Sequence, residues 1–309
     1  MTKVFIDGSA GTTGLRIYER LAERKDIELV LLSDSLRKDP SARKEALNNS
    51  DIAFLCLPDV AAKEAVDMLC NPNTVIIDTS TAHRTAPGWD YGFPELCDMK
   101  EKIKISKRIA NPGCHASGFV SLIAPLVEKG IINNDEKLTC FSVTGYSGGG
   151  KKMIADYELQ ENAEVLCPPR IYGLNQQHKH LPEMANICGL KYLPVFSPIV
   201  SSFYSGMEVT VPLFSSQING DIEKIKSVYK EYYNGRIVRF CEDGDENGFL
   251  SAGKFSGRDD MEIGVFGNGE RITLVSRFDN LGKGASGAAI QNMNIVLGVD
   301  ETLGLNIGG

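Results

Sequence analysis

The stretch KVFIDGSAGTTGLRIYERLAER, Lys3–Arg24, decides the fold of the first half of the chain. Its apolar start, Val4–Asp7, predicts a buried strand, and the pattern from about Gly11 to the end of the stretch predicts a helix. Glycines at positions 8, 11 and 14 let the backbone turn tightly between these two elements. A strand that enters a helix through a glycine loop predicts a βα unit, whose next strand runs parallel to the first.

The alternation of strand and helix continues beyond this stretch. Apolar runs at Glu28–Leu32, Ile52–Leu57 and Val75–Asp78 predict three further strands, and Asp59–Leu69 predicts a helix. Repeated βαβ units predict an α/β domain with a Rossmann-type, doubly wound parallel sheet.

The pattern changes at Asn111-Pro112-Gly113, where we place a domain boundary. A helix is expected from Cys114 until Gly130 stops it, and another near Asp221–Tyr233. The second domain is therefore predicted to be α+β, with a mixed sheet that is covered on one face. Its longer strands, rich in β-branched residues, are expected at 138–144, 195–200, 208–213, 237–240 and 271–278.

A last helix, about Ala285–Leu297, is rich in small residues, which suits close packing, and it could return to the first domain. The expected domains are residues 1–113 together with about 284–309, and residues 114–283.

The composition indicates a globular protein of about two domains, with 309 residues of which 42% are hydrophobic. The net charge of −7 gives no general attraction for nucleic acid or an anionic membrane surface, so neither is expected as a partner. Apolar runs fall short of the roughly 18 residues that span a bilayer, and Met1–Asp7 reaches an acid before a signal-peptide core could form. A cytoplasmic location is expected.

The eight cysteines never occur as Cys-x-x-Cys, and most lie within apolar stretches. Reduced thiols are therefore expected rather than a disulfide framework. No metal site is expected, because a zinc knuckle would lack its ligands.

The spacing Gly8-x-x-Gly11-x-x-Gly14 predicts a dinucleotide-binding loop. Its glycines let the backbone, Thr12 and Thr13 included, approach a pyrophosphate, whose charge meets the unpaired N–H groups at the start of the helix. The spacing is looser than Gly-x-Gly-x-x-Gly, and a plain βα turn is the alternative.

The residues after the second strand bear on which nicotinamide cofactor the loop would hold. Asp34 could accept a hydrogen bond from the ribose 2′-hydroxyl of NAD, whereas Ser33, Arg37 and Lys38 could hold the 2′-phosphate of NADP. We favour NADP(H).

A second glycine cluster, Thr144–Lys152, fits Gly-x-x-x-x-Gly-Lys but has Lys152 where a P-loop needs a hydroxyl for Mg²⁺, which argues against an NTPase. It lies between an expected strand and a helix from about Lys151. Its backbone, including Gly148, could contact a phosphate or the nicotinamide, and a flexible turn is the alternative.

Cys114 differs from the other cysteines because it falls on the first turn of an expected helix, where the helix dipole stabilises a thiolate. A nucleophilic thiolate beside a dinucleotide domain predicts thioester formation followed by hydride transfer. A cysteine in the core is the alternative.

His178 and His180 are half of the four histidines. If they lie on an extended segment, their rings point to opposite faces and cannot chelate a metal together. One could serve as general acid/base and the other contact substrate, with a surface pair as the alternative. His115 is expected to point elsewhere on its helix and to be a poor base, while His83-Arg84 offers a cation at the carboxyl edge of the first sheet.

Six motifs, spread over nearly the whole chain, carry a family resemblance. They are Gly8-x-x-Gly11-x-x-Gly14, DTSTAHR at 78–84, Asn111-Pro-Gly-Cys114, Ser147-Gly-Gly, His178-x-His180-x-Pro182-Glu183 and GASGAAIQNMN at 284–294. Together they resemble the shorter branch of the N-acetyl-γ-glutamyl-phosphate reductase family, which is related to aspartate-semialdehyde dehydrogenase.

The resemblance implies NADPH-dependent reductive dephosphorylation of N-acetyl-γ-glutamyl phosphate to the semialdehyde, in arginine biosynthesis, by a homodimer or homotetramer. It implies that the second domain serves catalysis and dimerisation, that Cys114 is the nucleophile and that His178 is the acid/base. At the substrate it implies Arg84, near the phosphate, with Asn111, Ser147, Tyr172 and His180. At the cofactor, besides the glycine loop and the residues after the second strand, it implies Pro58, Ser80, Gly148 and Asn292.

Two alternatives stay open. The chain could be an aspartate- or aminoadipate-semialdehyde dehydrogenase with the same chemistry, or a non-catalytic NADP-binding regulator, which the glycine loop alone would permit. It also departs from the longer members of the family at Phe203–Met207, where they place an arginine before the glycine, so no residue is assigned to the substrate carboxylate.

Overall fold

The computed structural model describes residues 1–159 and 163–308. The chain forms two compact units, and each is described by itself. The first comprises Met1–Pro94, Asp98–Pro112 and Ala285–Leu305, and the second comprises Glu95–Cys97, Gly113–Gly284 and the residues after Leu305.

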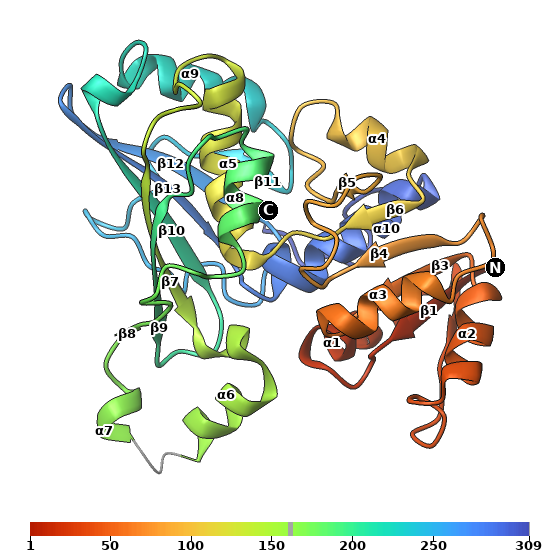
Figure 1. Ribbon diagram of the computed structural model, residues 1–309. Helices are drawn as coiled ribbons and strands as arrows, with labels where there is room; N and C mark the ends of the chain where they lie inside the picture. Colours follow the sequence, from red (N-terminus) through yellow and green to blue (C-terminus); the bar gives the residue numbers. More distant parts are fainter. Residues whose placement is uncertain (160–162, 309) are drawn as a thin grey trace. The chain divides into compact units, whose positions relative to one another are not determined.

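The first unit is built on a parallel sheet (Figure 1). Its six strands lie in the order β2-β1-β3-β4-β6-β5. Their bounds are β1 Thr2–Asp7, β2 Ile27–Val30, β3 Ile52–Leu55, β4 Val75–Asp78, β5 Asp90–Tyr91 and β6 Arg108–Ala110. Residues from β1, β3 and β4 are buried on both faces, as expected for a parallel sheet covered by helices on two sides.

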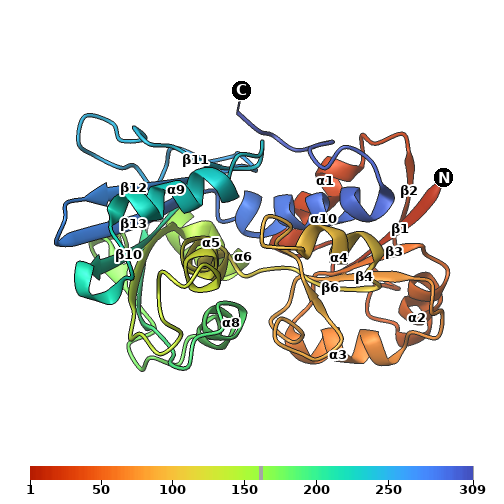
Figure 2. The same ribbon diagram turned by 90° about the horizontal axis from the view of Figure 1, so that it is seen from above.

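Helices cover both faces of this sheet, as Figure 2 shows. One face carries α1 (Thr12–Leu21), α4 (Met99–Ile105) and α10 (Gly287–Leu297), whose apolar side chains pack on alternate residues of the strands, such as Ile6 and Phe54. The other face carries α2 (Pro40–Asn48) and α3 (Asp59–Asp67), which pack on the intervening residues. The sheet is therefore doubly wound.

The second unit is built on a mixed sheet of seven strands in the order β11-β12-β13-β10-β7-β9-β8. The pairs β7–β9 and β11–β12 are parallel, and the other neighbours are antiparallel. The bounds are β7 Thr139–Gly145, β8 Arg170–Ile171, β9 Val195–Ser201, β10 Met207–Phe214, β11 Val238–Phe240, β12 Met261–Gly267 and β13 Arg271–Phe278.

One face of the mixed sheet is covered by helices (Figure 1). The long helix α5 (Cys114–Glu128) lies on β10 and β13, with α8 (Leu181–Ile187) and α9 (Ile222–Tyr232) beside it. A side chain at Gly118 would place its Cβ 2.4 Å from Val209 Cγ2, so this glycine lets α5 approach the sheet closely. The unit also contains α6 (Gly150–Glu158), α7 (Ala163–Leu166), the short turns Tyr146–Gly149 and Ser215–Gln217, and a π-turn at Gly282–Ser286.

The predicted fold class is confirmed. The expected strands and helices agree with the structure to within a few residues at each end, and β4 agrees exactly. The sequence patterns did not reveal the helices α2, α4, α7 and α8 or the strands β5, β6, β8 and β12. The C-terminal helix lies in the first unit, but the expected C-terminal segment of that domain ends earlier, because residues 306–308 belong to the second unit. Gly309 lies outside the described residues.

Among the described residues, none of the helices is both long enough and apolar enough to cross a bilayer.

Candidate active site

The first unit contains a cavity of about 440 Å³ at the carboxyl ends of β1 and β3. Ligands of open parallel sheets bind at this edge. The glycine loop, Gly8–Gly11, lines it together with Pro58 at the start of α3, and three cations complete it: Arg37, Lys38 and Arg43.

The loop needs glycine at its first and third glycine positions, because a side chain at either would clash with a neighbouring backbone carbonyl group. Gly8 has φ +87°, and a Cβ there would lie 2.3 Å from the carbonyl oxygen of Cys56. At Gly14 a Cβ would lie 2.4 Å from the carbonyl oxygen of Gly8. In the described chain, no side chain caps the start of α1 at Gly11, which leaves the N–H groups of Thr12 and Thr13 available to an anion.

The charged residues after β2 differ in their relation to the cavity. Arg37 and Lys38 line it, whereas Asp34 and Ser33 are not among its lining residues. The Asp34 carboxylate is almost fully exposed and lies 3.3 Å from Arg37 Nη1. Arg43 donates to both carboxylate oxygens of Asp7, at 3.2 to 2.9 Å, at the end of β1. Burial raises the pKa of Asp7, and the guanidinium of Arg43 opposes that rise.

The DTSTAHR motif follows β4 and forms a buried polar cluster. Ser80 Oγ donates to Asp78 Oδ2 at 2.7 Å, and His83 Nδ1 lies 2.6 Å from the same oxygen. The His83 ring stacks on Trp89 with 4.1 Å between the centroids. Arg84 is buried and donates to the carbonyl oxygens of Asn111 and Thr79, each at 3.0 Å.

Asn292, on α10, lies among polar groups of the same unit. Its Nδ2 donates to the carbonyl oxygen of Gly92 at 2.9 Å and to Asn111 Oδ1 at 3.3 Å. These bonds turn Oδ1 the other way, and this fully buried oxygen accepts no hydrogen bond from the described residues. A buried acceptor without a donor is costly. An amide donor such as the nicotinamide carboxamide would satisfy it, so the residue fits the role implied by the resemblance.

Cys114 is the first residue of α5, as predicted, and is partly exposed. No side chain from the described residues caps the helix at Gly113, so its first N–H groups remain available to a negative charge at the sulfur. The Gly113 N–H itself donates to Glu183 Oε1, on α8, at 2.8 Å. By contrast, Cys140 and Cys188 are buried, and burial raises the pKa of both thiols.

Five aromatic rings gather in the same unit as Cys114, and one of them, Phe196, lies 5.2 Å from both His115 and His178. The His178 and His180 centroids are 4.8 Å apart, and the His115 ring lies 5.4 Å and 5.6 Å from them. Tyr172 adds a fifth ring, 5.9 Å from His178. Burial raises the pKa of Tyr172, and the charge of the Cys114 sulfur adds to this rise.

Two expectations about the histidines are wrong. The segment of His178 and His180 is a turn rather than an extended strand, since Leu181 N–H donates to the carbonyl oxygen of His178 at 3.0 Å and α8 begins at Leu181. A turn brings both rings to one side. His115, expected to point elsewhere, belongs to the same cluster because it is held by Ser142 and Tyr172. The described residues contain no group of three or more His, Cys, Asp or Glu that could hold a metal ion.

Both His178 and His115 are neutral at neutral pH. Burial lowers the pKa of His178 to about 4, and the charge of Lys179 adds to this effect. Burial lowers the pKa of His115 to about 3, with a smaller contribution from His178. A neutral imidazole can accept a proton, so His178 is in the form that a general base requires.

Ser147 and Gly148 lie in the short turn after β7, as part of the second glycine cluster. Ser147 is buried, and its Oγ accepts a hydrogen bond from Asn280 Nδ2 at 3.0 Å. Asn280 Oδ1 in turn accepts from the Gly206 N–H at 2.9 Å. Sequence reasoning missed Asn280, which fixes this turn against the end of β13.

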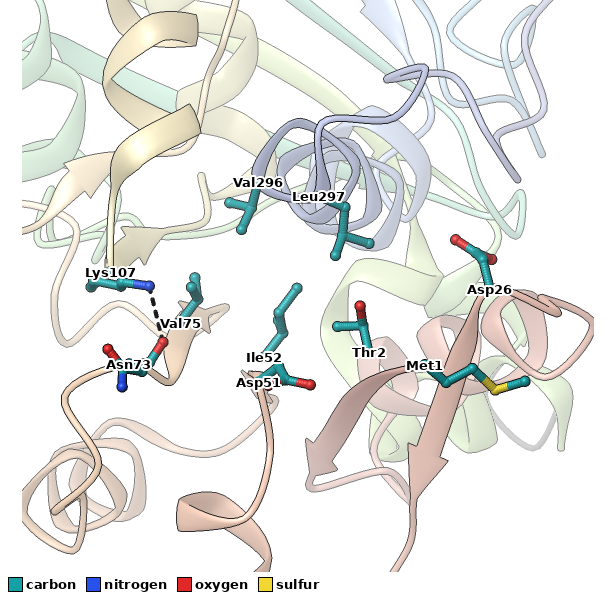
Figure 3. Close-up of a pocket in the computed structure, with 10 residues that line it drawn as sticks. All are labelled: Met1, Thr2, Asp26, Asp51, Ile52, Asn73, Val75, Lys107, Val296 and Leu297. Carbon is teal, nitrogen blue, oxygen red and sulfur yellow. Dashed lines mark hydrogen bonds between the residues drawn. The ribbon is translucent and has the colours of Figure 1, made fainter.

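A second hollow of about 640 Å³ lies at the opposite, amino edge of the first sheet (Figure 3). Its polar groups already have partners: Lys107 Nζ donates to the carbonyl oxygen of Asn73 at 3.0 Å, and Asp51 Oδ2 accepts from the Lys3 N–H at 2.8 Å. Asp26 pairs with Arg24 at 2.6 Å. This hollow contains none of the predicted site residues.

Two family models match the chain. Residues 3–105 match the NAD binding domain of semialdehyde dehydrogenases, and residues 114–280 match their dimerisation domain. Proteins from Nostoc sp. and Brucella ovis, named N-acetyl-gamma-glutamyl-phosphate reductase 2 and N-acetyl-gamma-glutamyl-phosphate reductase, are 45% and 44% identical to it. The matches cover 98% and 96% of this chain and 99% of each relative.

The fold is similar to that of solved aspartate semialdehyde dehydrogenases. The enzyme from Francisella tularensis superposes with a TM-score of 0.72 at 17% identity, covering 96% of this chain and all of the other. A second one, from Vibrio cholerae in complex with ASA, gives a TM-score of 0.70 at 16% identity, covering 96% and 98%. At these identities the likeness concerns the fold alone.

Proposed function

The chain belongs to the semialdehyde dehydrogenase family, and from that membership we propose that it reduces N-acetyl-γ-glutamyl phosphate to N-acetylglutamate 5-semialdehyde, a step of arginine biosynthesis. The substrate assignment follows the names of its relatives, which are 44–45% identical over nearly the full chain. The observation that carries the mechanism is the position of Cys114 at the start of α5, in the unit where the rings of His178 and His180 meet.

Cys114 acts as the nucleophile in this proposal. Its sulfur bonds to the γ-acyl carbon, the carbon–oxygen bond to phosphate breaks, and inorganic phosphate leaves with the bonding electron pair. The result is a thioester on Cys114. The first N–H groups of α5 stabilise the negative charge that develops on the sulfur as the thiol proton leaves, and the charge on the acyl oxygen during the attack.

His178 handles the proton. Because its pKa is about 4, the ring is neutral and takes the thiol proton as the sulfur attacks. A bound nicotinamide cofactor supplies the hydride that brings the thioester to the aldehyde level. His178 then returns its proton as the carbon–sulfur bond breaks. Tyr172, Ser147 and His180 are the groups of the second unit that we propose to orient the substrate, and Arg84 and Asn111 those of the first.

We propose NADP(H) as the cofactor. The glycine loop would receive the pyrophosphate, Pro58 and Asn292 would border the nicotinamide half, and Ser80 supports the loop after β4. The choice of NADP over NAD is supported by two cations, Arg37 and Lys38, that line the cavity. Asp34, which would favour NAD, is turned to solvent and paired with Arg37.

The proposed reaction is tested in reverse. In the presence of phosphate, the protein is expected to oxidise N-acetylglutamate 5-semialdehyde and reduce NADP⁺ more efficiently than NAD⁺. Without phosphate the rate should fall to background, since phosphate is the acyl acceptor. Aspartate semialdehyde and aminoadipate semialdehyde serve as competing substrates, and preference for either would replace the substrate that we propose.

One variant tests the choice of NADP over NAD independently of the proposed substrate. Arg37→Ala is expected to raise KM for NADP⁺ about tenfold while leaving KM for NAD⁺ nearly unchanged, because a charge-assisted contact to phosphate is lost. Arg20→Ala removes a cation from the last turn of α1 that does not line the cavity, and it serves as the matched control. Equal loss with both cofactors would contradict the NADP assignment.

We also propose that the protein is a homodimer formed through the second unit. The face of the mixed sheet opposite α5 carries exposed apolar side chains, including Phe141, Ile171, Val195 and Phe214. Register places these on the same face, and the match of this region to a dimerisation domain supports a second copy of the chain as the occupant.

Phe141→Glu is therefore expected to convert the wild-type dimer to a monomer in light scattering at micromolar concentration. A charge placed within an apolar interface would lose its hydration without a partner. Ile105→Glu, at an exposed position of α4 in the first unit, is the matched control and should remain dimeric. A wild-type protein that is monomeric would exclude the proposed interface.

A further inference from the structure

The ion pair between Asp7 and Arg43 takes no part in the mechanism above. Asp7 ends β1, Arg43 lies on the first turn of α2, and both side chains line the cavity with the glycine loop. Arg43 Nε donates to both carboxylate oxygens, at 3.2 and 3.0 Å, and Nη2 donates to Oδ2 at 2.9 Å. Charges are rarely buried in a ligand cavity unless they serve a purpose there, because their desolvation is costly.

The pair leaves part of the Arg43 guanidinium unused. A guanidinium carries five N–H groups. One on Nε and one on Nη2 bond to Asp7, and within the described part of the chain the Arg43 side chain donates to no other residue. Both N–H groups of Nη1 and the second one of Nη2 are therefore left for a ligand in the cavity.

The charge of the cavity indicates what kind of ligand these donors would meet. Its charged lining residues are Asp7, Arg37, Lys38 and Arg43, which give it a net charge of +2 in a chain whose net charge is −7. All three cations follow β2, and in a dinucleotide-binding fold this segment lies beside the adenosine ribose, while the pyrophosphate lies at the start of the first helix. The anion that fits them is a phosphate on the ribose 2′-oxygen.

The three cations differ in how firmly they are held. The Arg37 side chain is 45% exposed and its partner, Asp34, is 93% exposed, so water screens both groups. Lys38 is exposed as well. The Arg43 side chain is only 11% exposed, and Asp7 holds it at two nitrogen atoms. Arg43 therefore loses little conformational freedom when it binds an anion, and little water competes with that anion.

We propose that Arg43, oriented by Asp7, binds the 2′-phosphate of NADPH through its unused N–H groups and thereby distinguishes NADPH from NADH. This inference rests on the proposed function, which includes NADP(H), and adds to Arg37 and Lys38 a buried residue whose orientation is fixed before the cofactor binds. NADH carries a neutral hydroxyl where NADPH carries the phosphate, so it would offer these donors no charged oxygen.

The test measures cofactor binding without any semialdehyde. The full-length protein is titrated with NADPH and with NADH, whose own fluorescence reports binding. The variant combines Asp7→Asn with Arg43→Gln, so that both charges are removed together and no bare carboxylate remains in the cavity. Loss of charge-assisted hydrogen bonds is expected to raise Kd for NADPH by about 10- to 100-fold, while Kd for NADH changes less than about twofold.

This double variant distinguishes directed donors from two simpler roles. Its net charge equals that of the wild type, so a pair that acts only through net charge would leave both Kd values unchanged. A pair that only supports the fold would weaken the binding of NADPH and NADH together. Either result would overturn the proposal.

The matched control is the pair of Arg24 and Asp26 in the same unit. It is also bidentate, with Nε and Nη2 of Arg24 at 2.7 and 2.6 Å from the two carboxylate oxygens, but neither residue lines the cavity with the glycine loop. Asp26→Asn combined with Arg24→Gln should leave both Kd values unchanged. A loss of NADPH binding in this control equal to that in the Asp7 and Arg43 variant would refute the assignment.

A measurement on the wild-type sequence remains decisive if the double variant does not fold. With ¹⁵N-labelled arginine, the side-chain signals of Arg43, identified through Arg43→Lys, are expected to shift on addition of adenosine 2′,5′-bisphosphate and to stay in place with 5′-AMP. Signals that respond alike to both nucleotides would refute the proposal.

The same data keep this inference apart from the proposed function. If the preference for NADPH depends on Arg43 but N-acetylglutamate 5-semialdehyde is not oxidised, the proposed substrate is wrong and the inference holds. If the semialdehyde is oxidised with NADP⁺ and the double variant keeps the full preference for NADPH, the inference alone is wrong.

Discussion

Cys114→Ser is expected to lose nearly all turnover while the protein stays folded and still binds NADPH. A serine hydroxyl is scarcely ionised near neutral pH without a strong base, and the neutral donors at the start of α5 cannot lower its pKa far enough. The measurement is the steady-state rate of phosphate-dependent semialdehyde oxidation, with NADPH binding followed by fluorescence titration. Binding should be unchanged, because the cavity with the glycine loop belongs to the other unit.

Cys167→Ser provides the matched control. This cysteine belongs to the same unit but is exposed, and its replacement should leave turnover intact. Turnover in Cys114→Ser comparable to that of the wild type would exclude the thioester route.

His178→Ala is expected to lower turnover by roughly 10²- to 10⁴-fold, the usual loss when a general acid/base is removed. The matched variant is His180→Ala, whose ring is a direct neighbour in the same turn. It should act mainly on KM if His180 orients substrate. If His180→Ala lowers turnover and His178→Ala changes mainly KM, then His180 is the acid/base and His178 orients the substrate.

The pH profile gives the same assignment an independent check. Because the pKa of His178 lies at about 4, below the ordinary value of 6.5, the ring stays in its base form as the pH falls through 6 and 5. The acid limb of kcat/KM, which reports the free protein, is therefore expected near pH 4 rather than near 6.5. An acid limb at pH 6.5 that disappears in His178→Ala would contradict this expectation, because it would show that the His178 imidazole is exposed to solvent.

The fold of the first unit was predictable because its signals are local. The glycine loop, the apolar runs and the helix patterns each lie within a few residues of the element they predict, and β1, β3 and β4 were placed closely. The helix α2 was missed because Pro40–Asn48 buries only Ala46 and Leu47, so its sequence lacks a strong apolar face. The strand β12 was missed because Met261–Gly267 is interrupted by glycine and acid, and neighbouring strands on both sides keep it in the sheet.

The candidate site was predictable where it depends on one element. Cys114 was placed at the start of a helix from the preceding Pro-Gly, and α5 begins there. The contact between His178 and His180 depends on a turn, and the position of the His115 ring depends on Ser142 and Tyr172, which lie 27 and 57 residues away. Neither spacing nor periodicity contains information on such partners. The assigned roles of the individual site residues stay predictions.

The insertion of α10 into the first unit also bears on the order in which the protein matures during synthesis. Ala289, Ile290 and Met293 fill one side of the first sheet, yet they are translated almost 180 residues after the last strand of that sheet. Until α10 has left the ribosome, the nascent first unit exposes the part of its apolar surface that α10 covers in the folded protein. Chaperone binding to stalled chains should therefore persist beyond completion of the second sheet and end when α10 emerges.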